Sequence, residues 1–134
     1  MPLKNKGNLR AGLLIAAALL MLFGAFGNAL VMVPDLHGDL IEIGVRPTVL
    51  RGTVSALYFA AAAMFVFALM VSQAAFQSMR GAAIARTPLV AVAAIHITTG
   101  AVAFSHSYNP HHLGAVLMGV LIVVALAVPA SDTR

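Results

Sequence analysis

The few charged residues of this chain are confined to the gaps between four long apolar runs. Of its 134 residues 61% are hydrophobic, and only eight are basic and four acidic. A soluble domain carries about a quarter charged residues, whereas the charged fraction here is 9%. The chain therefore suits lipid better than water as its solvent. We expect it to cross a bilayer four times as a single domain.

The four apolar runs predict an all-α membrane protein, a four-transmembrane-helix bundle formed by residues 1–134. A helix needs about 20 apolar residues to cross a hydrocarbon core of roughly 30 Å. The first two runs reach this length, the last two are short, and the first is predicted to end at Pro34. It is also longer than the roughly 7–15-residue core of a cleaved signal peptide, so we expect it to be retained. The predicted spans are 11–33, 53–76, 86–105 and 112–129.

The basic residues predict which side of the membrane holds the chain ends. With four crossings, the segments before span one, between spans two and three, and after span four share a side. The opposite side has only Arg46 and Arg51. Because Lys and Arg accumulate on the cytoplasmic side, both termini are predicted to be cytoplasmic, in the plasma (inner) membrane of a bacterium. The basic residues on the predicted cytoplasmic side are Lys4, Lys6, Arg10, Arg80, Arg86 and Arg134.

Composition argues against several function classes. Cysteine is absent, so disulfides, thiolate nucleophiles and Cys-type zinc or iron–sulfur sites are not expected. The basic residues form no block or stripe, so nucleic acid is not an expected partner. Neither a Ser–His–Asp motif, nor an intramembrane carboxylate pair, nor a phosphate-binding glycine loop is recognisable. We therefore expect a protein that is not an enzyme.

One ionisable side chain lies deep inside a predicted span. At 1.5 Å per residue, His96 lies about 12 Å from the outer end of span three, and Asn28 and Tyr58 lie about 8 Å inside spans one and two. Polar groups at such depth are costly in hydrocarbon and are candidate functional groups. We expect neutral His96 to hydrogen-bond to Asn28, to Tyr58 or to a backbone carbonyl and so fix helix packing. A proton or ligand pathway and a haem or metal ligand are the alternatives.

Most other ionisable residues gather in the two predicted outer loops. The loop between spans one and two is apolar enough to lie on the membrane, and a short helix there would align its three acids on one stripe. In the other loop, Asn109-Pro110 predicts a tight turn near His106 and the pair His111 and His112, which would point apart on a helix. Imidazoles and carboxylates can bind a transition metal; the alternative is that they simply face water. The candidate ligands are His37, His106, His111, His112, Asp35, Asp39 and Glu42.

Three function classes fit these features. The first is an accessory or structural component of a membrane assembly, with the lipid bilayer and another membrane protein or a second copy as partners and no cofactor. The second is a haem- or metal-binding electron carrier or metal handler that uses the outward histidines. The third is a small transporter or channel. The chain has no internal repeat and few polar groups that could line a pathway, which argues against a transporter or channel. The accessory or structural role is therefore our prediction.

Overall fold

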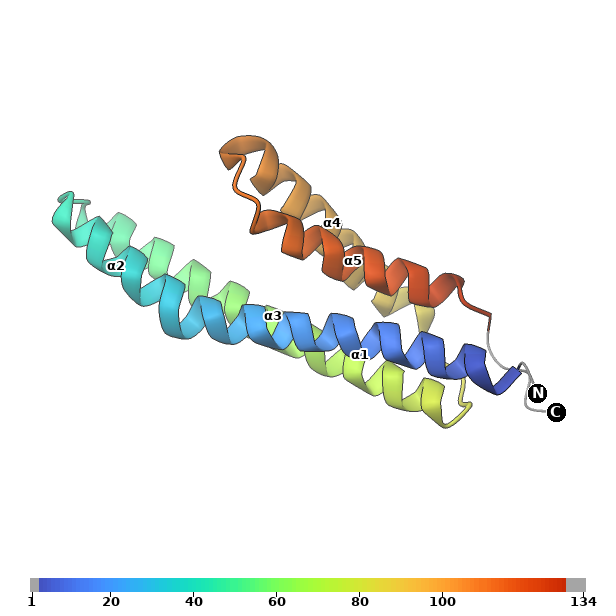
Figure 1. Cartoon of the computed structure of the whole chain (residues 1–134). Coiled ribbons are helices and arrows are strands. Elements are labelled where there is room, and N and C mark those ends of the chain that lie inside the picture. The colour runs from blue at the N-terminus through green and yellow to red at the C-terminus, as the bar shows by residue number, and fades with distance from the viewer. Residues whose placement is uncertain (1–2, 130–134) are drawn as a thin grey trace.

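The computed structural model describes residues 3–129, with side chains from residue 8 onward, and this part of the chain is entirely helical apart from short turns (Figure 1). Arg134 and the side chains of Lys4 and Lys6 lie outside it. The all-helical prediction is confirmed, and three rods are long and apolar enough to cross a membrane. The elements are α1 (Leu3–Gly27), η1 (Asn28–Met32), α2 (Val33–Glu42), α3 (Pro47–Met79), α4 (Arg86–Ser107) and α5 (His112–Ala127).

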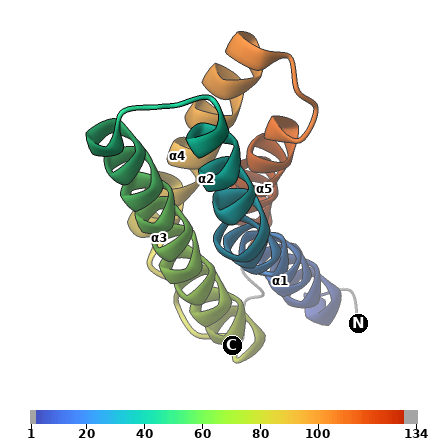
Figure 2. The same ribbon diagram turned by 90° about the vertical axis from the view of Figure 1, so that its left-hand side faces the viewer.

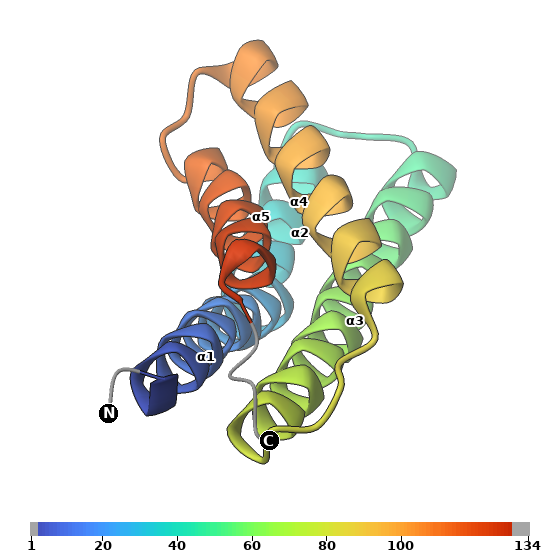
Figure 3. The ribbon, with the colours of Figure 1, turned by 90° about the vertical axis from the view of Figure 1, so that its right-hand side faces the viewer.

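The helices form two antiparallel hairpins. The continuous rod α1–η1–α2 packs along α3, and α4 packs along α5. The two hairpins are joined chiefly through α1 and α5, whereas α3 and α4 meet over only a few residues. Figures 1 and 2 show the hairpins spreading apart toward the end that carries α2 and the α4–α5 turn. In Figure 3 the start of α1, the α3–α4 connection and the end of α5 lie together at the other end.

The apolar core lies where all four rods meet, in the half of the bundle near the start of α1. Leu14 and Met21 of α1, Val71 of α3, Leu89 of α4 and Ile122 of α5 are fully buried there. Alanines fill much of the remaining core, which lets the helices approach closely. In a bilayer the lipid tails are as apolar as these side chains, so van der Waals packing, rather than the hydrophobic effect, favours this contact.

Two glycines allow α4 and α5 to come into backbone contact. A Cβ placed on Gly119 would lie 2.7 Å from the carbonyl oxygen of Ala93 and 2.6 Å from Cγ1 of Ile97. A Cβ on Gly100 would lie 2.9 Å from the backbone nitrogen of Val116. Since real Cβ atoms do not approach other atoms this closely, any larger residue must push the two helices apart. This glycine seam fixes the second hairpin.

The predicted helix end at Pro34 is wrong, because the first rod continues through it to Glu42. Proline has no N–H, and its ring clashes with the carbonyl of the residue four positions earlier, here Leu30. The chain accommodates this in the wider turn η1, in which the N–H of Val33 donates to the oxygen of Asn28, five residues back. A π-turn therefore replaces the expected helix end.

The first hairpin is consequently longer than predicted. The stretch Asn8–Glu42 of its first rod contains 35 residues and α3 contains 33, about 52 Å and 50 Å at the helical rise. α3 begins at Pro47, and the expected membrane-surface loop is reduced to a turn at residues 43–46 in which Gly44 has φ 72°. Both helical lengths exceed the roughly 30 Å thickness of a hydrocarbon core. α4 has 22 residues and α5 has 16, about 33 Å and 24 Å.

The glycine seam leads to a stability prediction. Gly119→Ala places a methyl group against the backbone of α4, and overpacking of this kind costs about 1–3 kcal/mol. We therefore expect a lower melting temperature for the purified protein in detergent. Gly114→Ala is the matched control, since a Cβ there meets nothing within 4 Å and alanine favours the helix by about 1 kcal/mol over glycine. An equal effect of the two substitutions would contradict the seam.

Candidate functional site

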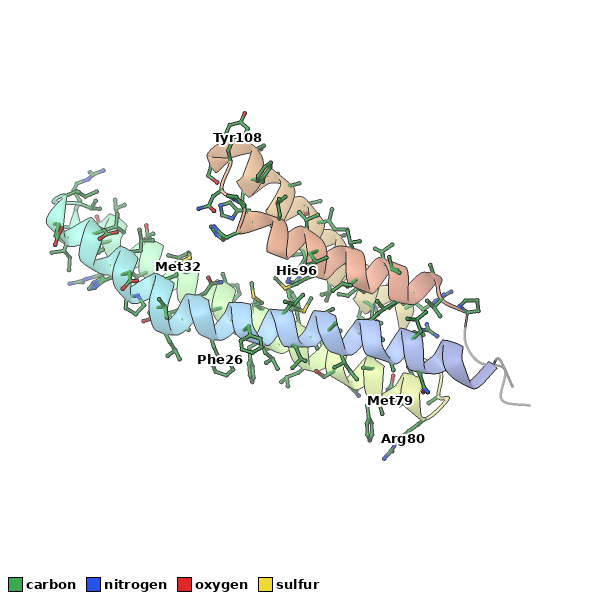
Figure 4. All side chains as sticks on the ribbon, in the orientation of Figure 1. Phe26, Met32, Met79, Arg80, His96 and Tyr108 are labelled. Atoms are coloured by element: carbon green, nitrogen blue, oxygen red, sulfur yellow. The ribbon has the colours of Figure 1, made fainter. Side chains whose placement is uncertain are left out.

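His96 is the deepest buried ionisable side chain of α4 and lies at the edge of the core. Its side chain is 4% exposed, and Nδ1 lies 2.9 Å from the carbonyl oxygen of Val92, one helical turn earlier. Nδ1 donates this hydrogen bond in the tautomer that carries its proton there. The imidazole also meets the ring of Phe67 on α3 edge to face, with centroids 5.8 Å apart and planes at 68°. Figure 4 shows it pointing from α4 toward the first hairpin.

The structure does not bring the other two predicted intramembrane residues to His96. Asn28 begins η1, which packs against α1 and α3 but has no contact with α4. Tyr58 lies on α3 with 46% of its surface exposed. None of the hydrogen bonds between described residues joins the three side chains. Of the hydrogen-bond partners predicted for His96, the structure therefore supplies the backbone carbonyl. Phe67, in the second predicted span, provides one contact between the hairpins.

The candidate metal ligands fall into two separate groups. His37 and the three acids lie on α2, where the conditional prediction of a short helix holds and all four side chains are exposed. His106 lies in the last turn of α4, His112 begins α5, and His111 directly precedes it. α2 contacts neither α4 nor α5, because the hairpins diverge at this end. Within residues 3–129, no group of three or more His, Asp or Glu side chains is arranged to hold a metal ion.

The turn between α4 and α5 differs from its prediction in one respect. His111 and His112 were expected to point apart, but their ring centroids lie 3.8 Å from each other. His111 is exposed and precedes the first turn of α5, so its ring can lean over its neighbour. The turn itself forms at the Asn-Pro pair. The Asn109 side-chain oxygen accepts a hydrogen bond from the His111 N–H at 3.1 Å, and Tyr108 adopts φ 52°.

The hydroxyl groups of α4 also find partners in their own helix. Thr98 donates to the Ala94 carbonyl at 2.7 Å, and Thr99 donates to the Ile95 carbonyl at 2.6 Å. Such bonds to carbonyls of the previous turn satisfy a hydroxyl where water is absent. Together with His96, these groups provide the polar chemistry of the middle of α4, and the hydrogen bonds found for them all go to carbonyls of their own helix.

Two arginines mark the opposite end of the bundle. Arg86, the first residue of α4, donates from its guanidinium to the carbonyl oxygen of Leu126 at 2.6 Å. This caps the last turn of α5, where the helix dipole favours a cation. Arg10 of α1 is 7% exposed and thus buried. In the sequence Arg10 is simply one of the basic residues on the predicted cytoplasmic side, and no local pattern reveals its burial.

Comparison of this chain with protein-family models, with curated proteins and with solved structures finds no match. Arguments about function therefore depend on the residues themselves.

The contact of His96 with Phe67 predicts a stability effect. Removing the imidazole leaves a void against the first hairpin, so we expect His96→Ala to destabilise the bundle by about 2–4 kcal/mol, as other large-to-small core changes do. The double variant with Phe67→Ala should reveal a coupling of about 0.5–1.5 kcal/mol in thermal unfolding in detergent.

His106→Ala is the control, since this histidine lies on the same helix but is exposed. If His96→Ala is as stable as His106→Ala, the imidazole does not fix the packing of the hairpins.

Proposed function

We propose that this chain is a small multi-pass protein of the bacterial plasma membrane that serves as an accessory or structural component of a membrane assembly and is not itself an enzyme. It would cross the membrane four times, with both termini in the cytoplasm. Its partners would be the lipid bilayer and either another membrane protein or a second copy of the chain. The proposal includes no cofactor.

The exposed surface supports a bilayer as the surroundings. Large apolar side chains cover the outside of the three long rods, and Phe23 and Phe59 are each 77% exposed. Such a surface would be costly in water but is ordinary against lipid tails or another apolar helix. The fourth rod, α5, is about 6 Å shorter than a typical hydrocarbon core. Local thinning of the bilayer accommodates a difference of this size at modest cost.

The distribution of the arginines supports the proposed orientation. Arg10, Arg80 and Arg86 belong to the end of the bundle where α1 starts and α3 meets α4. Arg46 and Arg51 belong to the other end, beside the acids of α2. The positive-inside rule assigns the first end to the cytoplasm.

One observation carries the accessory role: the buried imidazole of His96 binds its own backbone and packs on Phe67. It thus acts as a packing group between hairpins, and the neighbouring hydroxyls are likewise bound to their own helix. A transport pathway or a catalytic centre needs polar groups directed toward a substrate. The interior instead consists of closely packed small and apolar side chains, which suits a protein that acts through its surface.

The proposed topology can be tested because the chain is free of cysteine. We expect Thr48→Cys and Ser107→Cys to react with a membrane-impermeant maleimide in intact spheroplasts, whereas Ala82→Cys should react only after lysis. All three positions are exposed in the fold, so access depends on the side of the membrane. Labelling of Ala82→Cys in intact spheroplasts would reverse the proposed orientation, and failure of the protein to remain in the membrane fraction would reject the membrane assignment.

The accessory role predicts what the purified protein carries. We expect preparations in mild detergent to be colourless, to lack stoichiometric transition metal, and to retain a partner. The partner is either one membrane protein or a second, differently tagged copy, and both are readily detected by affinity capture. A Soret band, or a metal lost in His111→Ala, would instead favour the electron-carrier or metal-handling class. Ion or drug flux in liposomes that His96→Ala abolishes would favour transport.

A further inference from the structure

An open cavity lies at the end of the bundle where α3 connects to α4. Its volume is about 440 Å³, and its lining consists of Arg10, the connecting residues Gly81, Ala82, Ala83 and Ile84, and Arg86. Two of its six lining residues are therefore permanent cations. The four acids of the chain are Asp35, Asp39, Glu42 and Asp132. The first three lie on α2 at the far end of the bundle, and Asp132 lies outside the described residues.

Arg10 is the unusual member of this cavity. Its side chain is more than nine-tenths buried, and Nε has no hydrogen-bond partner among the described residues. The nearby guanidinium of Arg86 repels it. A buried N–H donor without a partner is unfavourable, so an anion that binds between the two arginines would relieve both the missing hydrogen bond at Nε and the repulsion.

The backbone around the cavity offers further donors. The N–H groups of Ala83 and Ile84 make none of the backbone hydrogen bonds found between described residues. α4 begins at Arg86 without a side-chain cap, so the N–H groups of Arg86 and Thr87 have no partner within the helix, and the positive end of its dipole lies at this edge. Arg86 uses one guanidinium nitrogen on Leu126 and keeps other N–H donors. Helix N-termini and arginines together are a recurrent phosphate-binding arrangement.

We propose that this cavity binds the phosphate group of an anionic phospholipid in the leaflet at the α3–α4 end. The inference rests on the proposed placement in a bilayer. Arg10 directly precedes the apolar run of α1, and Arg86 opens α4, so both lie at the depth of the headgroups. Basic pockets between transmembrane helices at the cytoplasmic face are suited to such lipids. Bound there, the lipid would join α1 to the α3–α4 connection and hold the two hairpins together at this end.

The test measures lipid binding and its effect on stability in the full-length protein. In detergent, added phosphatidylglycerol should raise the melting temperature and appear as a bound adduct in native mass spectrometry, whereas phosphatidylcholine should do neither. Arg10→Gln should weaken the apparent affinity for phosphatidylglycerol by about tenfold, the effect of losing one charge-assisted hydrogen bond. Without lipid, this variant should be at least as stable as the parent, because it lacks the unpartnered Nε–H group and the repulsion from Arg86. Loss of binding would then not reflect loss of the fold.

Arg80→Gln is the matched control. It removes the same charge at the same end of the bundle, but Arg80 lies over the ring of Phe76 at 4.0 Å and does not line the cavity. Equal loss of binding in the two variants would overturn the proposal in favour of general surface attraction. Equal binding of phosphatidylglycerol and phosphatidylcholine would overturn it as well.

Two further outcomes identify other anions. If inorganic phosphate at low millimolar concentration gives the same stabilisation as the lipid, the site binds the free ion and the lipid assignment is wrong. If phosphatidylglycerol does not raise the melting temperature of the parent chain but does raise that of Asp132→Asn, a carboxylate of the chain itself occupies the cavity and the lipid assignment is wrong. A protein that is inserted in the membrane but shows no lipid preference rejects this inference alone, whereas one that does not insert rejects the proposed function.

Discussion

The proposed placement in a bilayer makes one physical constraint central, namely that hydrocarbon offers no hydrogen-bonding partners. A backbone or side-chain polar group inside a bilayer must find its partner within the protein. The chain meets this condition locally: His96, Thr98 and Thr99 each bind a carbonyl of the preceding turn. At Pro34 the backbone widens into the π-turn η1 instead of breaking. The buried Nε of Arg10 is the exception among the described residues, since it has no partner. The proposed anion site lies in the cavity beside it.

Apart from the hydrogen bond between Arg86 of α4 and Leu126 of α5, contacts between the described parts of the rods depend mainly on how closely their surfaces fit together. Gly100 and Gly119 bring the α4 and α5 backbones together, and alanines from every rod contribute to the core near the start of α1. Toward the outer end these contacts cease and the hairpins spread apart (Figure 2). We propose that a bundle whose rods pack closely near the start of α1, and whose hairpins diverge at the other end, binds a membrane partner through its surface. This view agrees with the proposed accessory role.

Local features of the sequence predicted some of these details and missed others. Hydropathy predicted helices in all four apolar runs, and the Asn109-Pro110 pair predicted the turn between α4 and α5. The end expected at Pro34 is wrong, since proline stops a helix only where the backbone cannot widen. The candidate metal ligands do not form one cluster, because the loops that carry them belong to hairpins that diverge. Two loops on the same predicted face need not be neighbours.

By itself the sequence determined the helical class, the number of apolar runs and the separation of arginines between the two ends, since these follow from composition and order along the chain. Only the tertiary structure decided which helices touch, that His96 meets Phe67 rather than Asn28, and that Arg10 is buried beside Arg86. Packing between rods depends on where small residues allow backbones to approach. Which helices pack together therefore depends on pairs of surfaces that lie far apart in the sequence, and no local pattern encodes such a pairing.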